Sequence, residues 1–227
     1  MKAEEYVRKR LFELKNDEYK EFHSKLMPNI DKETIIGVKV PDVRNVAKEM
    51  IDMRLSEDYL SVLPHIYYEE NNLHGLLINK IKDFGETVSR LDCFLPFVDN
   101  WATCDIIKPQ SFKKRPDGLE EKAYEWIDSG KTYTVRFGIG VLMNYFLDDG
   151  FKEEHIKKAL DGDREEYYVS MMVAWYLSFA FVKQYDAAKK YISREYLDEL
   201  TFKRTVRKIL DSFRVPEETK KEIKKLL

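Results

Sequence analysis

Apolar side chains recur every three or four residues along most of this chain. In the first segment, from Glu4 to Leu14, one helical face carries Tyr6, Val7, Leu11 and Leu14. Such spacing is typical of an amphipathic helix, and no segment shows the alternation with a period of two that a strand would need. The pattern therefore predicts an all-helical chain.

The predicted helices are separated by short polar turns. Pro28 ends the second helix and Pro41 begins the third, because proline is tolerated at the first turn of a helix but not in its interior. The predicted helices are 4–14, 17–27, 41–53, two helices hinged near Pro64 within 59–82, 86–98, a short helix from Trp101 capped by Asp99 and Asn100, 119–128, 132–147, 153–160, 164–182, 185–191, 194–211 and 217–227. The basic interval between them, Lys108 to Gly118, is predicted to be the longest loop.

Short turns between the helices after residue 119 require antiparallel neighbours. A spacing of roughly 35–45 residues per helix pair matches HEAT-like or armadillo-like repeats. We therefore expect one domain over residues 1–227, a curved solenoid of about five or six helix pairs. A compact helical bundle is the alternative.

Composition narrows the class of protein. Charged residues make up 35% of the chain, which suits a helical repeat in which every helix shows one face to water. Two cysteines do not make a disulfide framework, and neither a signal peptide nor an apolar run of about 18 residues is present. We expect a monomeric cytoplasmic protein that does not associate with membranes.

The familiar motifs of cofactor and nucleophile chemistry are missing from the sequence. The four histidines are scattered without metal-ligand spacing, and no Walker loop, GxGxxG or GxSxG occurs. We expect no metal and no cofactor. The formal net charge of −2 counts mildly against a nucleic-acid binder, although the charge on one face decides that question.

One segment, DNWATCDII, carries candidate chemistry. Trp101 and Asp105 are four residues apart, so on a helix they share one face. An aromatic ring beside a carboxylate can stabilise positive charge, because the ring face is electron-rich and the carboxylate carries a full charge. The alternative is that Trp101 belongs to the core and Asp105 is simply solvated.

Two further residues interrupt apolar helices. Arg136 lies within YTVRFGIGVLMNYF, where an arginine needs an anion or a route to water. Trp175 lies within YYVSMMVAWYLSFAFV, which is apolar nearly all round. Arg136 could instead pair with a structural carboxylate, and Trp175 could be ordinary packing.

With these residues in view, the sequence resembles the DNA alkylation repair enzymes of the AlkD type, which are HEAT-like-repeat DNA glycosylases. The resemblance runs over most of the chain, through GVKVPDVRNVAKEM, WATCD, YTVRFGIGVLM, YYVSMMVAWYLS and FKRTVRKILDSFRVPEETK. It implies that Asp105 is the catalytic aspartate, that Trp101 and Trp175 are the tryptophans of the cleft, and that Arg136 is its arginine. The family is usually basic, whereas this chain is slightly acidic.

The resemblance also implies a reaction. The substrate would be duplex DNA carrying purines alkylated at N7 or N3, which are cationic and leave without protonation. Asp105 would stabilise the oxocarbenium-like sugar and orient water, Trp101 and Trp175 would frame the lesion, and Arg136 would hold a phosphate. No metal or cofactor is needed.

A concave face of the solenoid would then bind the DNA backbone. The candidate residues for this binding are Lys108, Lys113, Lys114, Arg115, Lys203, Arg204, Arg207 and Lys208; the alternative is that they form an ordinary solvated face. Bound to DNA, the protein would associate with a bacterial-type nucleoid. Two other functions stay open, a DNA-binding scaffold of the same family with little or no excision and a helical-repeat module for protein interaction.

Overall fold

The computed structural model describes residues 2–162 and 165–225, and within these ranges it contains helices and turns but no strand. The prediction of an all-helical chain is confirmed. The chain divides into two compact units, Met1–Pro116 (unit 1) and Asp117–Leu227 (unit 2), and each is described by itself. The single domain and the curvature expected from the sequence stay predictions.

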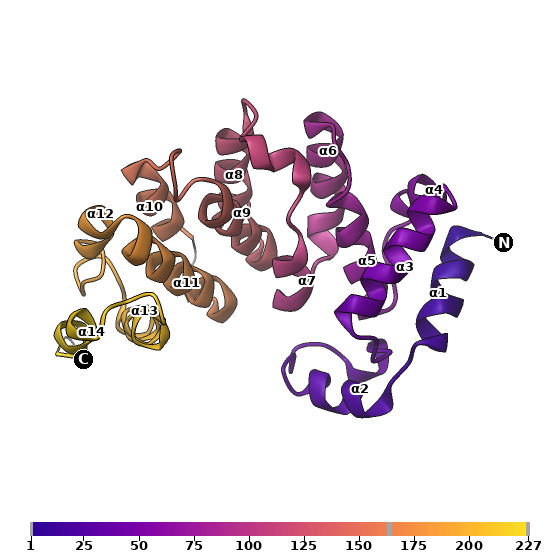
Figure 1. Ribbon diagram of the computed structural model, residues 1–227, viewed down its shortest axis with the longest axis horizontal. Helices are drawn as coiled ribbons and strands as arrows, with labels where there is room; N and C mark the ends of the chain where they lie inside the picture. The colour runs from indigo at the N-terminus through magenta and orange to yellow at the C-terminus, as the bar shows by residue number, and fades with distance from the viewer. Residues whose placement is uncertain (1, 163–164, 226–227) are drawn as a thin grey trace. The chain divides into compact units, whose positions relative to one another are not determined.

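Unit 1 is built around one fully buried helix. Every residue of α5 (Tyr68–Ile78) is buried, and the helix contacts α1, α3, α4, α6 and α7 (Figure 1). The elements of unit 1 are α1 (Ala3–Glu13), α2 (Asp17–Ser24), η1 (Lys32–Thr34), α3 (Val40–Asp52), α4 (Ser56–Leu60), α5, α6 (Phe84–Phe94), η2 (Leu95–Phe97), α7 (Trp101–Ile106) and η3 (Gln110–Lys114).

Three predicted boundaries in unit 1 are wrong. The helix expected from Tyr59 is a single turn that begins at Ser56 and ends at Leu60, before Pro64. The helix expected to reach Met27 ends at Ser24. The basic interval 108–118 is not all loop, because residues 110–114 form a 3-10 helix. The Phe112 side chain of this helix is buried.

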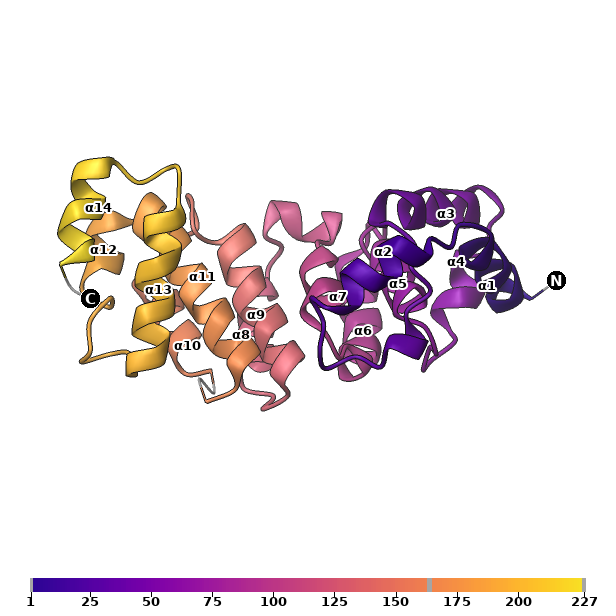
Figure 2. The same cartoon turned by 90° about the horizontal axis from the view of Figure 1, so that it is seen from below.

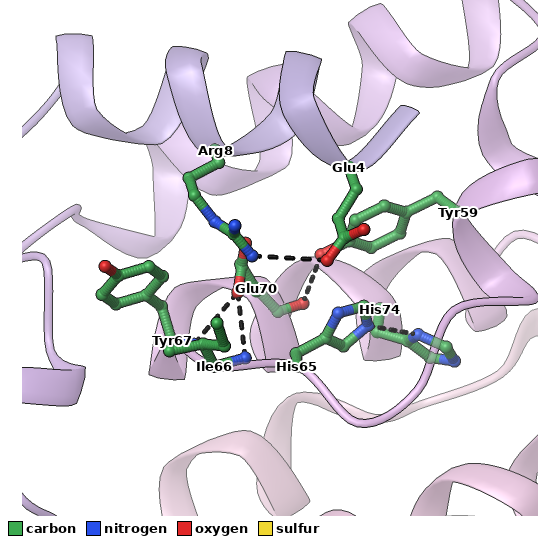
Figure 3. A network of polar contacts seen from close by, with 8 residues as sticks. All are labelled: Glu4, Arg8, Tyr59, His65, Ile66, Tyr67, Glu70 and His74. Atoms are coloured by element: carbon green, nitrogen blue, oxygen red, sulfur yellow. Dashed lines mark hydrogen bonds and ion pairs between the residues drawn. The ribbon is translucent and has the colours of Figure 1, made fainter. Parts of the chain in front are cut away.

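Two buried carboxylates of α5 hold the surrounding segments in place. Glu69 accepts hydrogen bonds from the backbone N–H groups of Ile36, Gly37 and Val38 at 2.7–3.0 Å. Glu70 accepts one from the Arg8 side chain of α1 at 3.0 Å and two more from backbone N–H groups ahead of α5 (Figure 3). A buried carboxylate is stable only with such partners, so α1 and the segment before α3 are tied to α5.

Unit 2 is arranged around α11 (Tyr167–Lys183), which contacts α9, α10, α12 and α13. Figure 2 shows α11 and α13 side by side. The other elements of unit 2 are α8 (Leu119–Ile127), α9 (Thr132–Tyr145), α10 (Glu153–Leu160), α12 (Tyr185–Lys189), α13 (Glu199–Asp211) and α14 (Glu217–Lys224).

A glycine allows α8 and α9 to pack closely. A Cβ atom on Gly138 would lie 2.8 Å from the backbone oxygen of Ala123, closer than real Cβ atoms come. The turn between the two helices is short and contains Gly130 at φ +68°, a conformation that favours glycine. These two helices form the kind of pair that the sequence predicts.

The helix expected from Arg194 begins five residues later, at Glu199. The Asp198 side chain accepts the backbone N–H of Thr201 at 2.9 Å and so caps α13 at that point. The predicted starts and ends at Arg164 and Leu227 lie outside the described residues. In the part of the chain that is described, no helix has the length and apolar character needed to cross a membrane.

Candidate functional site

The short helix α7 is fixed by a buried polar network. The Asn100 side chain accepts the backbone N–H of Thr103 at 2.7 Å, which confirms Asn100 as the predicted cap. The Thr103 hydroxyl donates to the Asn72 side chain of α5 at 2.8 Å and accepts from the Asn100 amide at 3.0 Å. All three side chains are buried, so α7 has a defined orientation on α5.

Trp101 adds a second anchor at the start of α7. Its indole N–H donates to the backbone oxygen of Leu26 at 3.1 Å. Its ring packs against an apolar cluster that includes Met27, Ile35 and Tyr68. The ring is therefore partly core and partly accessible, and its role in a site stays a prediction.

The accessible side of α7 carries the candidate pair. Residues 102–104 are buried, whereas Trp101 and Asp105 are partly exposed one helical turn apart. The pair offers an aromatic ring and a carboxylate to the same region of solvent. Chemically, this arrangement suits a ligand that carries or develops positive charge.

Replacing Thr103 by valine should destabilise unit 1 while preserving the shape of the side chain. The substitution removes the hydroxyl that donates to the buried side-chain oxygen of Asn72 and that accepts from the Asn100 amide, and such a loss costs about 1–3 kcal/mol. Urea unfolding compared with the wild type measures the change. A variant as stable as the wild type would show that the network does not hold α7.

A basic cavity lies next to this helix. The cationic pocket, a cavity of about 570 Å³, has five basic residues and no acidic one among the described residues that line it. The five are Arg44, Lys48, Lys80, Lys108 and Lys113. None of them forms an ion pair with any described carboxylate. Unpaired cations around a concave surface attract anions, above all phosphates.

Asn79 holds the wall of the cationic pocket together. Its side chain accepts the backbone N–H of Lys108 at 2.6 Å and donates to the backbone oxygen of Ile106 at 2.8 Å. The Gln110 side chain in turn donates to the backbone oxygen of Lys80 at 2.5 Å. Ile106 lines the pocket and directly follows Asp105, so the pocket adjoins the candidate pair along the chain.

Only part of the lining of this pocket is predicted from the sequence. Of the four basic residues predicted between 108 and 115, Lys108 and Lys113 line it, whereas Lys114 and Arg115 do not. Arg44, Lys48 and Lys80 are missed. Arg44 and Lys48 stand one helical turn apart within the segment that carries the family resemblance, and this spacing is the signal that could have found them.

Unit 2 holds the other two predicted site residues. Arg136 is buried on α9 and donates to the backbone oxygen of Tyr168 at 2.8 Å. Trp175 is partly exposed on α11, with the Lys208 ammonium 5.9 Å from its ring centroid. Trp101 and Asp105 belong to unit 1, so the meeting of all four residues in one cleft stays a prediction.

The predicted basic residues of α13 differ in their surroundings. Lys203 pairs with Glu199 at 3.1 Å, and Arg207 is exposed. Arg204 donates to the Ser170 hydroxyl at 2.6 Å, with its guanidinium 4.8 Å from the Tyr167 ring centroid. Arg204 and Lys208 therefore face α11, whereas Lys203 and Arg207 face solvent.

Among residues 2–162 and 165–225, no group of three or more histidine, cysteine or acidic side chains is arranged to hold a metal ion. The His65 and His74 side chains do meet, with their ring nitrogens 2.8 Å apart (Figure 3). Tyr59 stacks on His65, and Phe94 stacks on His74. His74 is buried and His65 is half-buried, and both pack against aromatic side chains.

The chain matches a family model described as DNA alkylation repair enzyme over residues 7–209 of 227. The match spans α7, the cationic pocket, and helices α8 to α12 with most of α13. No curated protein and no solved structure matches the chain. The family match covers nearly nine tenths of the sequence, and the chain therefore belongs to the family of DNA alkylation repair enzymes.

Proposed function

We propose that this protein is a DNA glycosylase that hydrolyses the N-glycosidic bond of purines alkylated at N7 or N3 in duplex DNA. Alkylation at those positions gives the base a positive charge, so it leaves without being protonated. The remaining task is to stabilise positive charge on the deoxyribose and to direct a water molecule to it. A carboxylate beside an aromatic ring is suited to both.

The observation that carries the proposal is the Trp101–Asp105 pair on the accessible side of α7. Thr103 and Asn100 fix the helix through buried hydrogen bonds, and the indole N–H of Trp101 is held by the backbone of Leu26. A carboxylate on such a rigid support needs little reorganisation when charge develops beside it.

The roles proposed for unit 2 follow from the resemblance. Trp175 presents part of its ring to solvent and would contact the nucleotide around the lesion. Arg136 already donates one hydrogen bond to the backbone oxygen of Tyr168. The resemblance assigns it to a phosphate of the DNA backbone, a contact for which a planar guanidinium is suited.

Backbone binding would come from the cationic pocket. The whole chain carries a formal charge of −2, yet five cations without ion pairs line this one cavity. Local charge governs the attraction of a polyanion, so an acidic protein can bind DNA through such a patch. Because Ile106 lines the pocket, phosphates bound there would lie near Asp105.

The test of the proposed reaction is release of free base from duplex DNA treated with a methylating agent. Chromatography of the supernatant should detect 7-methylguanine or 3-methyladenine that accumulates with time and with enzyme. Untreated duplex is the control. No release at high enzyme excess, with DNA binding retained, would support the scaffold function instead.

The cationic pocket leads to a prediction on the dependence of binding on salt. Replacing Lys48, Lys80 and Lys108 by glutamine should weaken duplex binding and make its salt dependence less steep. Each phosphate contact contributes a slope of roughly 0.9 in log affinity against log salt, so the slope should fall by about 2–3. Fluorescence anisotropy between 50 and 200 mM salt measures it.

The matched control is the replacement of Lys221, Lys224 and Lys225 by glutamine. These three lysines are exposed near the C-terminus, outside the residues matched by the family model. The control removes the same number of charges and should leave the salt slope unchanged. Equal effects of the two triple variants would mean that only net charge matters and that the pocket is not the binding site.

A further inference from the structure

A narrow accessible stripe runs along α11. Between Val169 and Phe181, the side chains that are not buried are Met171, Trp175 and Phe179, at a spacing of four residues. Tyr167, 52% exposed, continues the same spacing at the start of the helix. Side chains four residues apart stand one above another on a helix, so three aromatic rings and one thioether form a line.

Cations accompany each ring of this stripe. The Arg204 guanidinium lies 4.8 Å from the ring centroid of Tyr167, and the Lys208 ammonium lies 5.9 Å from that of Trp175. The Arg214 guanidinium, after α13, lies 5.6 Å from the centroid of Phe179. Each ring of the stripe therefore has a cation within 6 Å of its centroid, two of them from α13 and one from the residues that follow it.

The stripe ends in a cavity of about 360 Å³. Trp175 and Phe179 form one side of it, and Lys208, Phe213 and Arg214 line the other. Phe213 is fully exposed at the rim and makes no ring contact with any described aromatic residue. Its two faces are therefore open to a ligand, whereas cations already lie over the rings of Trp175 and Phe179.

We propose that this cavity binds an unpaired nucleotide of DNA, an inference that rests on the DNA-binding part of the proposed function. The nucleobase would stack on the open ring of Phe213, and its phosphate would lie between Lys208 and Arg214. Stacking platforms interleaved with cations are how proteins hold single-stranded nucleic acid. Among the described residues that line the cavity, Asp211 is the single acidic one, so the two cations leave a net positive charge for a phosphate.

The combination of side chains selects this class of ligand. An apolar ligand would need the rings but not the cations, and a simple phosphate would need the cations but not the rings. A fully paired duplex hides its base faces in the stack, so it could not use Phe213. An unpaired nucleotide presents both an aromatic face and a phosphate.

The experiment compares two duplexes that differ by one extra nucleotide, a 2-aminopurine bulge, with the full-length protein. We expect the wild type to bind the bulged duplex more tightly than the paired one, by on the order of tenfold, as removal of base–aromatic stacking suggests. The 2-aminopurine fluorescence should be quenched on binding. Phe213→Ala should abolish both the preference and the quenching while binding the paired duplex as the wild type does.

Leu200→Ala is the matched control, because Leu200 is another exposed apolar side chain of unit 2, 63% exposed on α13, that does not line the cavity. It should keep the preference. Equal binding of the two duplexes by the wild type, or a preference that survives in Phe213→Ala, would overturn the proposal.

Base release from methylated DNA separates the failure of this proposal from that of the proposed function. A wild type that releases no base but keeps a preference for the bulge through Phe213 supports the nucleotide site and rejects the glycosylase reaction. A wild type that releases methylated base without any preference for the bulge rejects the nucleotide site alone.

Discussion

Replacing Asp105 by asparagine is expected to reduce base release from methylated duplex DNA by about two to four orders of magnitude. The substitution keeps the size and the position of the side chain on α7 but removes its negative charge. Loss of one group that stabilises transition-state charge or directs water costs about 10²–10⁴ in rate. The same change should alter the affinity for unmethylated duplex little, because binding depends on the phosphates.

Single-turnover base release by wild type and Asp105→Asn, side by side, measures this loss. Asp58→Asn is a control with the same change of charge, on an exposed position of α4. It should release base at the wild-type rate. If Asp105→Asn retained full activity, the carboxylate would have no part in the reaction, and the accessible pair on α7 would lose its proposed meaning.

Trp101 sharpens the expectation for Asp105. Its indole N–H is engaged by Leu26, so the ring is held on the same side of α7 as the carboxylate. In the proposed reaction, the fixed ring face would attract the cationic base through its quadrupole, and the carboxylate would act on the sugar. A reaction of this kind needs no group to protonate the leaving base.

The helices could be predicted from the sequence wherever one face is apolar and the other polar. The helix α10 was predicted with its observed ends, because three apolar side chains line one face and charged residues the other. The ends of α5 were not predicted, because this helix buries polar side chains along with its leucines. The buried polar residues are Glu69, Glu70, Asn71 and Asn72. Polar side chains in a segment suggest exposure, and only the tertiary partners reveal why these are buried.

The candidate site shows the same division. Trp101 and Asp105 could be paired from their spacing alone, since a turn of helix puts residues four apart on one face. The cationic pocket could not be predicted from spacing, because its five basic residues come from α3, the end of α5, and the segment around η3. Local spacing predicts pairs on one helix, whereas a pocket depends on how several helices pack.

Unit 1 should lose about 3–4 kcal/mol of unfolding free energy between pH 7 and pH 5 through two histidines. Burial lowers the pKa of His65 to about 4 and that of His74 to about 3 (Figure 3). In the unfolded chain each histidine titrates near pH 6.5. Below pH 6.5 the histidines bind protons in the unfolded state but remain neutral in the folded state. The free energy of unfolding therefore decreases as the pH is lowered, by about 2 kcal/mol for each histidine at pH 5.

The surroundings of His65 and His74 account for their low pKa values. Their rings share one hydrogen bond of 2.8 Å, in which one nitrogen must accept, and the His65 Nδ1 atom is buried without a partner. Tyr59 stacks on His65 with ring centroids 4.7 Å apart, and Phe94 stacks on His74 at 4.3 Å. A proton on either ring would add a charge that these aromatic neighbours cannot solvate as water does.

Urea unfolding at pH 7, 6 and 5 tests this prediction, in a background with Trp126 and Trp175 replaced by phenylalanine. The fluorescence of Trp101 then reports unit 1 alone. A variant with His65→Gln and His74→Leu should lose much less stability over this range, whatever its stability at pH 7, because the pH slope depends only on protons gained on unfolding.

His155→Gln, in unit 2, should leave the slope of unit 1 unchanged. Carboxylates cannot account for the difference, because free aspartate and glutamate titrate near pH 4 and their contribution is common to both proteins. Parallel slopes for the wild type and the double variant would mean that the His65–His74 pair takes up protons in the folded state.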